Sequence, residues 1–209
     1  GMVGSHLADF LLENTDWDIY GLMRWNEDQE NISHLVERIN NKNRVFIEYG
    51  DINDLSSMLH VFQKVEPDYL FHLAAQSFPK TSFESPLETL ETNILGTAKV
   101  LEAIRRLKQD PVVHVCASSE VFGRVAQEDL PIHEDLTFHP ASPYAISKVG
   151  TDLIGRYYAE ACGLTVMTTR MFTHTGPRRG DVFAESTFAK QIAMIEAKII
   201  PPVIKVGNL

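Results

Sequence analysis

The sequence predicts a protein of the α/β class, built on a doubly wound parallel sheet. Short apolar runs of strand length alternate with amphipathic helical patterns along the whole chain. Successive strand-like runs are separated by enough residues for the helical crossover that parallel strands require. The sequence contains no internal repeat and no low-complexity segment, which would instead favour a repeat array or a disordered chain. We therefore expect helices on both faces of one sheet.

The expected elements follow from the period of the apolar residues. Strand-like runs rich in Val, Ile, Phe and Tyr occupy residues 19–23, 44–49, 69–73, 112–116 and 164–170. Helical patterns occupy residues 5–14, 55–64, 85–107 and 142–162. Prolines at positions 131, 140 and 143 mark an irregular stretch before the last of these helices.

Composition and charge exclude several classes of protein. The chain has 209 residues, of which 44% are apolar and 22% charged, as in ordinary globular proteins. Its net charge of −9 argues against a nucleic-acid partner, because such proteins carry a basic face. Its apolar runs are too short to cross a bilayer, and no leader pattern indicates secretion. Because Cys116 and Cys162 cannot make a disulfide framework, we expect reduced, packed thiols in a cytoplasmic protein.

The first residues combine glycines with the start of a helix. In dinucleotide-binding units, glycines at this place let backbone N–H groups approach a pyrophosphate at the helix N-terminus. Gly1 and Gly4 are therefore candidate cofactor contacts, although a plain helix-start turn is about as common. Arg24 follows the next expected strand, where an acidic residue would hold a ribose hydroxyl. An arginine there favours a 2′-phosphate, hence NADP over NAD, unless it only faces solvent.

Other polar residues stand within or just after the expected strands. Asp51 and Ile52 follow the run at 44–49 and could flank an adenine, with a simple turn aspartate as the alternative. The eight histidines have no metal-ligating spacing, so we expect no metal site. We expect His72 and His114, which lie within strands, to be core residues and not ligands.

Tyr144 and Lys148 form a Y-x-x-x-K pair on an expected helix. Residues four apart lie on the same helical face, about one turn from each other. An ammonium beside a phenol stabilises the phenolate, so Lys148 should lower the pKa of Tyr144 from about 10 towards neutrality. Such a phenolate can take a proton from a substrate hydroxyl while hydride leaves the adjacent carbon. By itself, however, the pair occurs by chance in many helices.

Ser118, Ser119 and Glu120 follow the buried run at residues 112–116. Ligands of open α/β sheets bind at the carboxyl ends of the strands. A hydroxyl at such an end can hydrogen-bond a reacting oxygen, and a carboxylate beside it can act as a second acid or base. A turn capped by serines is the alternative. Together with Tyr144 and Lys148, these residues are a much more specific signal of a catalytic site than either motif alone.

In this order along the chain, the motifs resemble those of the extended short-chain dehydrogenases/reductases of the nucleotide-sugar epimerase/dehydratase group. The resemblance is carried by Gly1, Gly4, Asn93, Tyr144, Lys148 and residues 50–52, 72–77, 118–120, 176–181, 188–192 and 206–209. Within the group the chain is most similar to the GDP-mannose 4,6-dehydratases, with the GDP-4-keto-6-deoxymannose reductases close behind. The resemblance implies a Rossmann-type domain over residues 1–170 and the start of a substrate-binding region over residues 171–209.

The resemblance implies an NADP-dependent 4,6-dehydratase acting on a GDP-linked sugar, with NAD as the alternative cofactor. Tyr144, assisted by Lys148, would deprotonate the 4-hydroxyl as hydride leaves C4, while Ser118 would hydrogen-bond the 4-oxygen. Glu120 would remove the C5 proton and protonate the hydroxyl that leaves C6, and the hydride would return to C6. A reductase that uses NADPH on a 4-keto sugar remains open, because that branch can also carry Ser-Ser-Glu. A third hypothesis is a non-catalytic regulator that binds a nucleotide. The presence of all four residues, Ser118, Glu120, Tyr144 and Lys148, argues against it.

The resemblance also implies binding roles for further residues. Cofactor contacts would come from Gly1, Gly4, Arg24, Asp51, Ile52, Leu73, Ala74, Ala75, Tyr144 and Lys148. Substrate contacts would come from Ser77, Ser119, Thr173, Arg178 and Lys190. Thr173 stands where the group usually has an asparagine, and its side chain reaches less far. Asn93 matches a helix-buried asparagine, which needs a backbone partner.

Assembly and chain length are implied in the same way. The two long helices at 85–107 and 142–162 resemble the pair through which the group forms homodimers and homotetramers. The group carries a further glycine and a first strand before the position of Gly1, about a dozen residues in a βα unit. Because that strand is central in the sheet, we expect a gap between its two neighbours. We therefore expect the 209 residues alone to bind NADP poorly and to be inactive.

Overall fold

The computed structural model describes residues 1–207, and its strands form two parallel sheets. One sheet holds β1 (Ile19–Met23) and β2 (Val45–Tyr49), and the other holds β3 (Tyr69–His72), β4 (Val112–Cys116) and β5 (Val166–Thr169), in that order. Every pair of neighbouring strands runs parallel. Each strand begins and ends within two residues of its expected position. The prediction of a parallel α/β fold is therefore confirmed.

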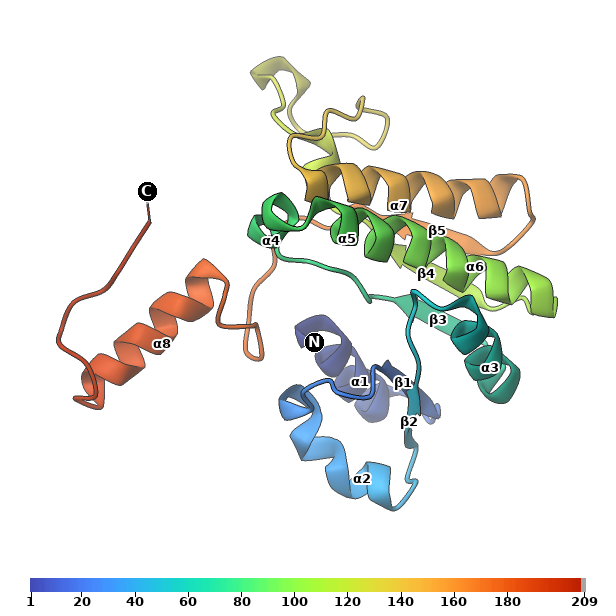
Figure 1. Cartoon of the computed structure of the whole chain (residues 1–209), viewed down its shortest axis with the longest axis horizontal. Coiled ribbons are helices and arrows are strands. Elements are labelled where there is room, and N and C mark those ends of the chain that lie inside the picture. Colours follow the sequence, from blue (N-terminus) through green and yellow to red (C-terminus); the bar gives the residue numbers. More distant parts are fainter. Residues whose placement is uncertain (208–209) are drawn as a thin grey trace.

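The sheet is interrupted between β1 and β3. Among the described residues no hydrogen-bonded pairing joins the two sheets, so each of these strands keeps one unpaired edge. Figure 1 shows the strands β1 and β2 set apart from the sheet of β3, β4 and β5. Near the amino ends of the two edge strands, Trp17 stacks on Tyr69 with ring centroids 4.6 Å apart. The expected gap in the sheet is thus present, and an aromatic contact bridges one end of it.

Three helices match their predictions closely, and one prediction of detail is wrong. The matching helices are α1 (Met2–Asn14), α3 (Leu55–Val65) and α7 (Pro143–Glu160). Helix α1 begins three residues earlier than expected, so Gly4 lies inside its first turn and not in a preceding loop. Gly1 is the N-cap residue of this helix.

The long helix expected at residues 85–107 is present but irregular. It consists of α5 (Pro86–Leu90), a π-helical turn η2 (Glu91–Leu95) and α6 (Gly96–Leu107). Other short elements were not expected: η1 (Glu30–Leu35), α2 (Val36–Asn40), α4 (Pro79–Glu84), η3 (Ser119–Phe122) and η4 (Gln127–Asp129). Helices of five or six residues are too short to show a helical period. The helix α8 (Ala184–Glu196) was also not expected, and none of its residues is buried.

The core lies between the second sheet and the helices on one of its faces. Leu101 and Ile104 of α6 pack with Val113 and Val115 of β4, and none of these four side chains is exposed. Residues of α3, including Met58, complete this cluster. Figure 1 shows α5 and α6 end to end along one line, with α7 alongside them. This arrangement buries the apolar stripe of α6, as its period predicts.

The other face of the second sheet is less covered. Phe71 of β3 and Met167 of β5 are 39% and 56% exposed. An apolar hollow of about 360 Å³ separates this face from α1, and it is lined by Val3, Leu7, Phe71, Leu73, His114, Met167, Thr169 and Met171. Helix α1 therefore lies on this second face, as the prediction of helices on both faces requires. It leaves part of the apolar surface of the sheet exposed.

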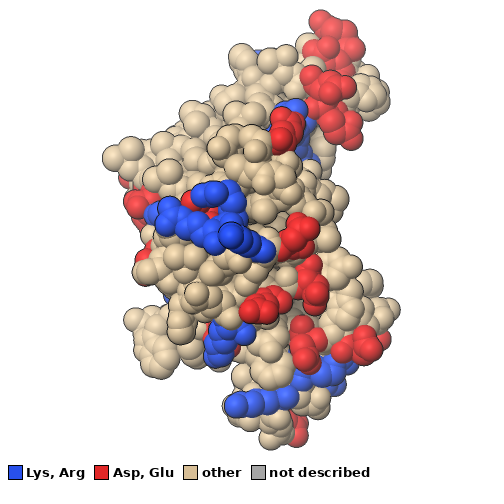
Figure 2. All heavy atoms as spheres, turned by 90° about the vertical axis from the view of Figure 1, so that its right-hand side faces the viewer, with Lys and Arg blue, Asp and Glu red and all other residues tan. Residues whose placement is uncertain are grey.

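Charged side chains of both signs lie on the surface of the molecule. On the face shown in Figure 2, the Lys and Arg side chains form a few small groups among scattered Asp and Glu side chains. Within residues 1–207, no helix is both long enough and apolar enough to cross a membrane.

His72 is a core residue, as expected. Its side chain is only 7% exposed, and Nε2 lies 2.9 Å from Oγ1 of Thr97. His114 is half-buried, with Nε2 2.8 Å from Oγ1 of Thr169. Each imidazole therefore has a hydroxyl partner.

Lowering the pH should destabilise the protein through His72. Burial, with smaller effects from Lys148 and His114, lowers the pKa of His72 from 6.5 to about 4. Between pH 6.5 and about 4, His72 is protonated in the unfolded chain but stays neutral in the folded protein. The free energy of unfolding should therefore fall by about 3 kcal/mol as the pH drops towards the folded-state pKa. Urea unfolding at several pH values should show this slope in the wild type and a shallower one in His72→Gln, because burial lowers the pKa of His114 as well. An identical slope in both proteins would contradict the assignment.

Gly123→Ala should be strongly destabilising, because Gly123 has φ +58° and ψ −135° and a Cβ there would lie 1.9 Å from the carbonyl oxygen of His139. We expect the free energy of unfolding to fall by about 3 kcal/mol or more. Gly163→Ala is the matched control, because Gly163 also has a positive φ, +72°, but no atom within 4 Å of an added Cβ. It should cost only about 1 kcal/mol. Equal losses in thermal and urea unfolding would show that the close approach to His139 is not what matters.

Candidate functional site

Helix α7 presents Tyr144 and Lys148 to the carboxyl end of β4. The helix begins where Ser142 caps it, its hydroxyl accepting a hydrogen bond of 3.0 Å from the backbone N–H of Ala145. Both side chains are buried, at 9% and 5% exposure. The Nζ of Lys148 donates to the carbonyl oxygen of Cys116 at 2.8 Å and lies 5.9 Å from the ring centroid of Tyr144.

Ser118 and Glu120 follow β4 and lie at its carboxyl end, near Tyr144 and Lys148. Ser118 is the N-cap of η3, and its Oγ accepts a 3.2 Å hydrogen bond from the backbone N–H of Glu120. The hydroxyl of Ser118 also lies close enough to the Tyr144 phenol to affect its pKa. Glu120 is exposed, and its charge acts on Tyr144. The structure therefore brings together the four residues expected to be catalytic.

The pKa of Tyr144 moves in the direction opposite to our expectation. Burial raises it to about 12; the neighbouring Ser118 hydroxyl opposes this rise, and the charge of Glu120 adds to it. Burial also lowers the pKa of Lys148 and raises that of Glu120. The expectation that Lys148 lowers the pKa of Tyr144 is wrong for this structure, because the ammonium is bound to the Cys116 carbonyl and desolvation dominates.

Asn93 fastens the segment after β3 to α7. Its Oδ1 accepts from the backbone N–H of Gln76 at 2.8 Å, and its Nδ2 donates to the Gln76 carbonyl at 3.0 Å. The same Nδ2 donates to Oγ of Ser147 at 2.8 Å. The backbone partner expected for this buried asparagine is therefore present, and it joins Gln76, which follows Leu73, Ala74 and Ala75, to Ser147 of α7.

The N-terminus of α1 has the features that a dinucleotide pyrophosphate requires. The N–H groups of Met2, Val3 and Gly4 precede the first intrahelical hydrogen bond, which runs from the N–H of Ser5 to the Gly1 carbonyl at 3.1 Å. A Cβ on Gly1 would meet no atom within 4 Å, and one on Gly4 would lie 4.0 Å from Leu73. An array of free donors next to the end of β3 therefore fits a phosphate-bearing cofactor.

The remaining expected cofactor contacts have structural partners of their own. Arg24 is exposed and forms an ion pair with Glu27. Asp51 accepts a 2.8 Å hydrogen bond from the backbone N–H of Asn53. This contact fits the turn aspartate that we gave as the alternative to an adenine contact. Ile52 is 7% exposed and lies against Gly96, so the core accounts for its apolar character.

Among the expected substrate residues, Ser119 lies between Ser118 and Glu120, and within the described part of the chain no contact joins the other four to the candidate catalytic residues. Ser77 and Thr173 are exposed loop residues, and Ser119 donates its N–H to the Met171 carbonyl at 2.9 Å. Arg178 donates to Oδ2 of Asp9 in α1 at 2.6 Å. Lys190 of α8 donates to Oδ2 of Asp181 at 2.6 Å. Among the described residues, therefore, both cations expected at the diphosphate are paired with carboxylates.

Two further ionic contacts were missed by the sequence reasoning. Asp9 binds His34, at 2.7 Å, as well as Arg178. Arg170, which we placed at the end of a strand, pairs with the buried carboxylate of Asp152 on α7. Partners so far apart along the chain leave no local pattern that would reveal them.

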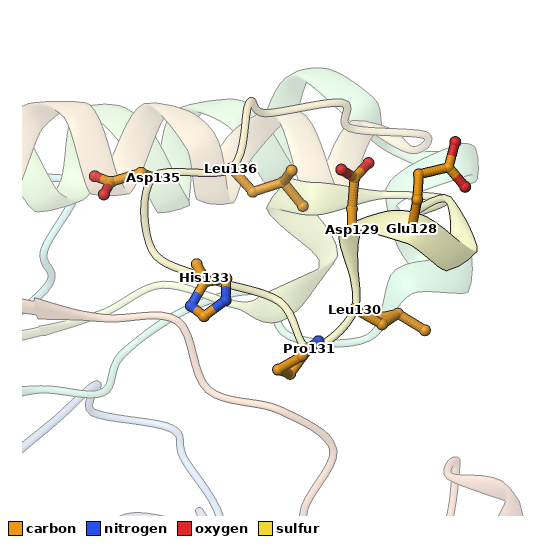
Figure 3. A pocket seen from close by; sticks show the side chains of 7 residues that line it. All are labelled: Glu128, Asp129, Leu130, Pro131, His133, Asp135 and Leu136. Atoms are coloured by element: carbon orange, nitrogen blue, oxygen red, sulfur yellow. The ribbon is translucent and has the colours of Figure 1, made fainter.

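A second hollow lies in the segment between η3 and α7. It measures about 340 Å³ and is lined by Glu128, Asp129, Leu130, Pro131, His133, Asp135 and Leu136. Figure 3 shows the carboxylates of Glu128 and Asp129 at one end and that of Asp135 at the other. Three carboxylates would repel a nucleotide diphosphate, so this hollow is not the nucleotide site.

Solved structures with this fold bind nicotinamide cofactors. A dTDP-glucose 4,6-dehydratase from Streptomyces venezuelae, solved with NAD, superposes with a TM-score of 0.81 and 26% identity, over 92% of this chain and 59% of that one. The protein RMD from Pseudomonas aeruginosa, solved with NADPH, superposes with a TM-score of 0.70 and 29% identity, over 80% of this chain and 59% of that one.

Curated relatives agree with this fold. The GDP-mannose 4,6-dehydratase of Yersinia enterocolitica is 33% identical over 93% of this chain and 53% of its own length. That of Drosophila melanogaster is 33% identical over 100% of this chain and 53% of its own length. The chain thus spans about half the length of the curated relatives it matches. A family model described as GDP-mannose 4,6 dehydratase matches residues 1–209, and the chain belongs to this family.

Proposed function

We propose that the protein carrying this chain is an NADP-dependent dehydratase that converts a GDP-linked mannose to its 4-keto-6-deoxy form. The observation that carries the proposal is the convergence of Ser118, Glu120, Tyr144 and Lys148 at the carboxyl end of β4. Family membership supports the choice of a dehydratase over a reductase. NAD is the alternative cofactor, since relatives of this fold are solved with either nucleotide.

Tyr144 is the proposed base for the sugar 4-hydroxyl. A phenolate oxygen accepts that proton, and the hydroxyl of Ser118 donates a hydrogen bond to the oxygen that becomes a carbonyl. Lys148 is the only cation that we assign to Tyr144. To stabilise the phenolate the ammonium must come closer to the phenolate oxygen, because Coulomb attraction falls with distance. It has three N–H donors, so it can do this while it still donates to the Cys116 carbonyl.

Glu120 is the proposed acid and base for the second half of the reaction. A 4-keto group makes the C5 proton acidic, and a carboxylate at this strand end can remove it. The same carboxyl group then protonates the hydroxyl that leaves C6 as water. Burial raises the pKa of Glu120, which favours a group that takes up a proton and gives it back.

The chain offers a binding surface for the cofactor and the start of one for the sugar nucleotide. The N–H groups at the start of α1 would hold the pyrophosphate, and the segment of Leu73, Ala74 and Ala75 would lie beside it. When bound, the cofactor accepts hydride from C4 and returns it to C6. We assign residues 1–170 to this cofactor domain and residues 171–209 to the start of the substrate region. There Arg178 and Lys190 would bind the diphosphate in exchange for Asp9 and Asp181.

The outer face of the helical layer is the proposed dimer interface. On α7, the exposed side chains Ile146, Leu153 and Tyr157 recur at helical spacing. Leu87 and Leu95, beside them on α5 and η2, are 79% and 51% exposed. A second copy meeting this face would bury one continuous apolar stripe. The two free cysteines favour a cytoplasmic location.

The reaction and its two catalytic halves can be tested together in the gene product that contains this chain. GDP-mannose with a trace of NADP should yield a 4-keto product without net formation of NADPH. Tyr144→Phe removes the base for the 4-hydroxyl and should slow turnover about 10²–10⁴-fold. Glu120→Gln should still oxidise C4, seen as transient reduced nicotinamide, but should no longer exchange the C5 hydrogen with D₂O.

Matched controls separate these effects from general damage. Tyr69→Phe lies at the amino end of β3, and Glu128→Gln lies in η4, so both should leave turnover intact. If the wild type ignores GDP-mannose but consumes NADPH with a 4-keto sugar, the reductase is the correct assignment. Normal turnover in Tyr144→Phe would reject the catalytic role of that residue.

Leu153→Asp should convert the dimer to a monomer, because it places a charge in the centre of the apolar stripe. Leu153 is 49% exposed in the protomer, so the substitution should leave the fold and its circular dichroism unchanged. Val36→Asp, on α2 and 40% exposed, is the control and should remain dimeric. Light scattering after gel filtration measures the mass. A Leu153→Asp protein that stays dimeric would place the interface elsewhere.

A further inference from the structure

Arg170 connects three parts of the molecule that surround the catalytic residues. It follows directly after β5, and its side chain is only 15% exposed. Its Nε donates to Oδ2 of Asp152 at 2.9 Å, and its Nη2 donates to Oδ1 at 3.3 Å. Asp152 is 1% exposed and lies one helical turn beyond Lys148 on α7. The guanidinium therefore holds the catalytic helix through a buried, two-pronged ion pair.

The same guanidinium lies against two aromatic rings. Its Cζ is 5.3 Å from the ring centroid of Phe122 and 4.7 Å from that of Phe138. Phe122 is the last residue of η3, two residues after Glu120. Phe138 belongs to the segment 123–142, and Arg170 also donates through Nη1 to the carbonyl of Glu134 in that segment. Stacked cations of this kind fix a ring and a charge relative to each other.

Apart from their contacts with Arg170, the three parts (α7, η3 and the segment 123–142) differ in how much of the fold they pack against. Helix α7 has 18 residues and packs along β4, β5 and α6. The turn η3 has four residues, and the segment 123–142 contains only the short η4. Backbone hydrogen bonds from Ser119 to Met171 and from His139 to Val121 also hold them, and the side chains of Val121 and Phe122 are buried, whereas that of Glu120 is exposed. Loosening Arg170 should therefore move Glu120 more than Tyr144.

We propose that Arg170 is a positioning residue that sets the place of the Glu120 carboxylate relative to the Tyr144 phenol. The inference rests on the proposed function, in which these groups act on the adjacent carbons C5 and C4 of one sugar ring. Groups that act on neighbouring atoms tolerate little displacement, and a shift of about 1 Å can cost about 10²-fold in rate. Arg170 itself touches neither proton.

Arg170→Lys tests the proposal in the gene product that contains this chain. Lysine keeps a charge for Asp152, but its ammonium lacks the planar fork that binds both carboxylate oxygens while contacting Phe122 and Phe138. Exchange of the C5 hydrogen with D₂O should slow about 10- to 100-fold. Oxidation at C4 and the KM for GDP-mannose should change less than about threefold. Arg156→Lys, at an exposed position on the same helix, is the control and should alter neither step.

Phe138→Leu provides a second, gentler variant that keeps the ion pair and removes one stacked ring. It should slow C5 exchange in the same selective way by about threefold or more, and it decides the matter if Arg170→Lys does not fold. Unchanged C5 exchange in a folded variant, or an equal loss of both steps, overturns the positioning role. The wild-type control separates the two claims, because a wild type that does not form the 4-keto product refutes the proposed function instead.

Discussion

Parallel pairing of β3, β4 and β5 is the constraint on which the site depends. It brings the carboxyl ends of the three strands to one edge of the sheet, where the segments that follow them meet. The pairing continues past the strand ends, since the N–H groups of Ala117 and Ser119 donate to the carbonyls of Thr169 and Met171. An antiparallel β4 would carry Ser118 to the opposite end of the sheet. Helix α7 is locked to the same edge by the hydrogen bond from Lys148 to Cys116.

Burial gives this site its electrostatic character. It raises the pKa of Tyr144 and lowers that of Lys148, so desolvation favours the neutral form of both groups. The Tyr144 hydroxyl therefore stays protonated unless an ammonium comes close to it. Glu120 is the more exposed of the three, yet partial burial of its carboxyl group still raises its pKa. The two groups of the proposed reaction therefore occupy environments of different polarity, as their different tasks require.

The sequence allowed the strands, the long helices and the grouping of Ser118, Glu120, Tyr144 and Lys148 to be predicted, because each has a local signal. The strands are continuous apolar runs, α7 begins at a serine cap followed by Pro143, and the motif around Tyr144 lies within one helix. The π-helical turn at 91–95 was not predictable, because tertiary contacts such as those of Asn93 accompany it and no local pattern marks it. Arg178 was expected at a ligand, yet its partner Asp9 lies 169 positions away. The same holds for Arg170, whose contacts come from three separate segments.

The interruption between β1 and β3 also bears on how the protein behaves in solution. A strand with a free edge presents a row of backbone donors and acceptors, which is a template for pairing with another chain. On these two strands the nearby side chains Tyr20, Leu22 and Phe71 are apolar and more than a third exposed. Neither strand contains the proline or lysine that commonly blunts such edges. Among the described residues these edges are open to strand pairing, so a segment that pairs with them would complete the sheet and also cover these apolar side chains.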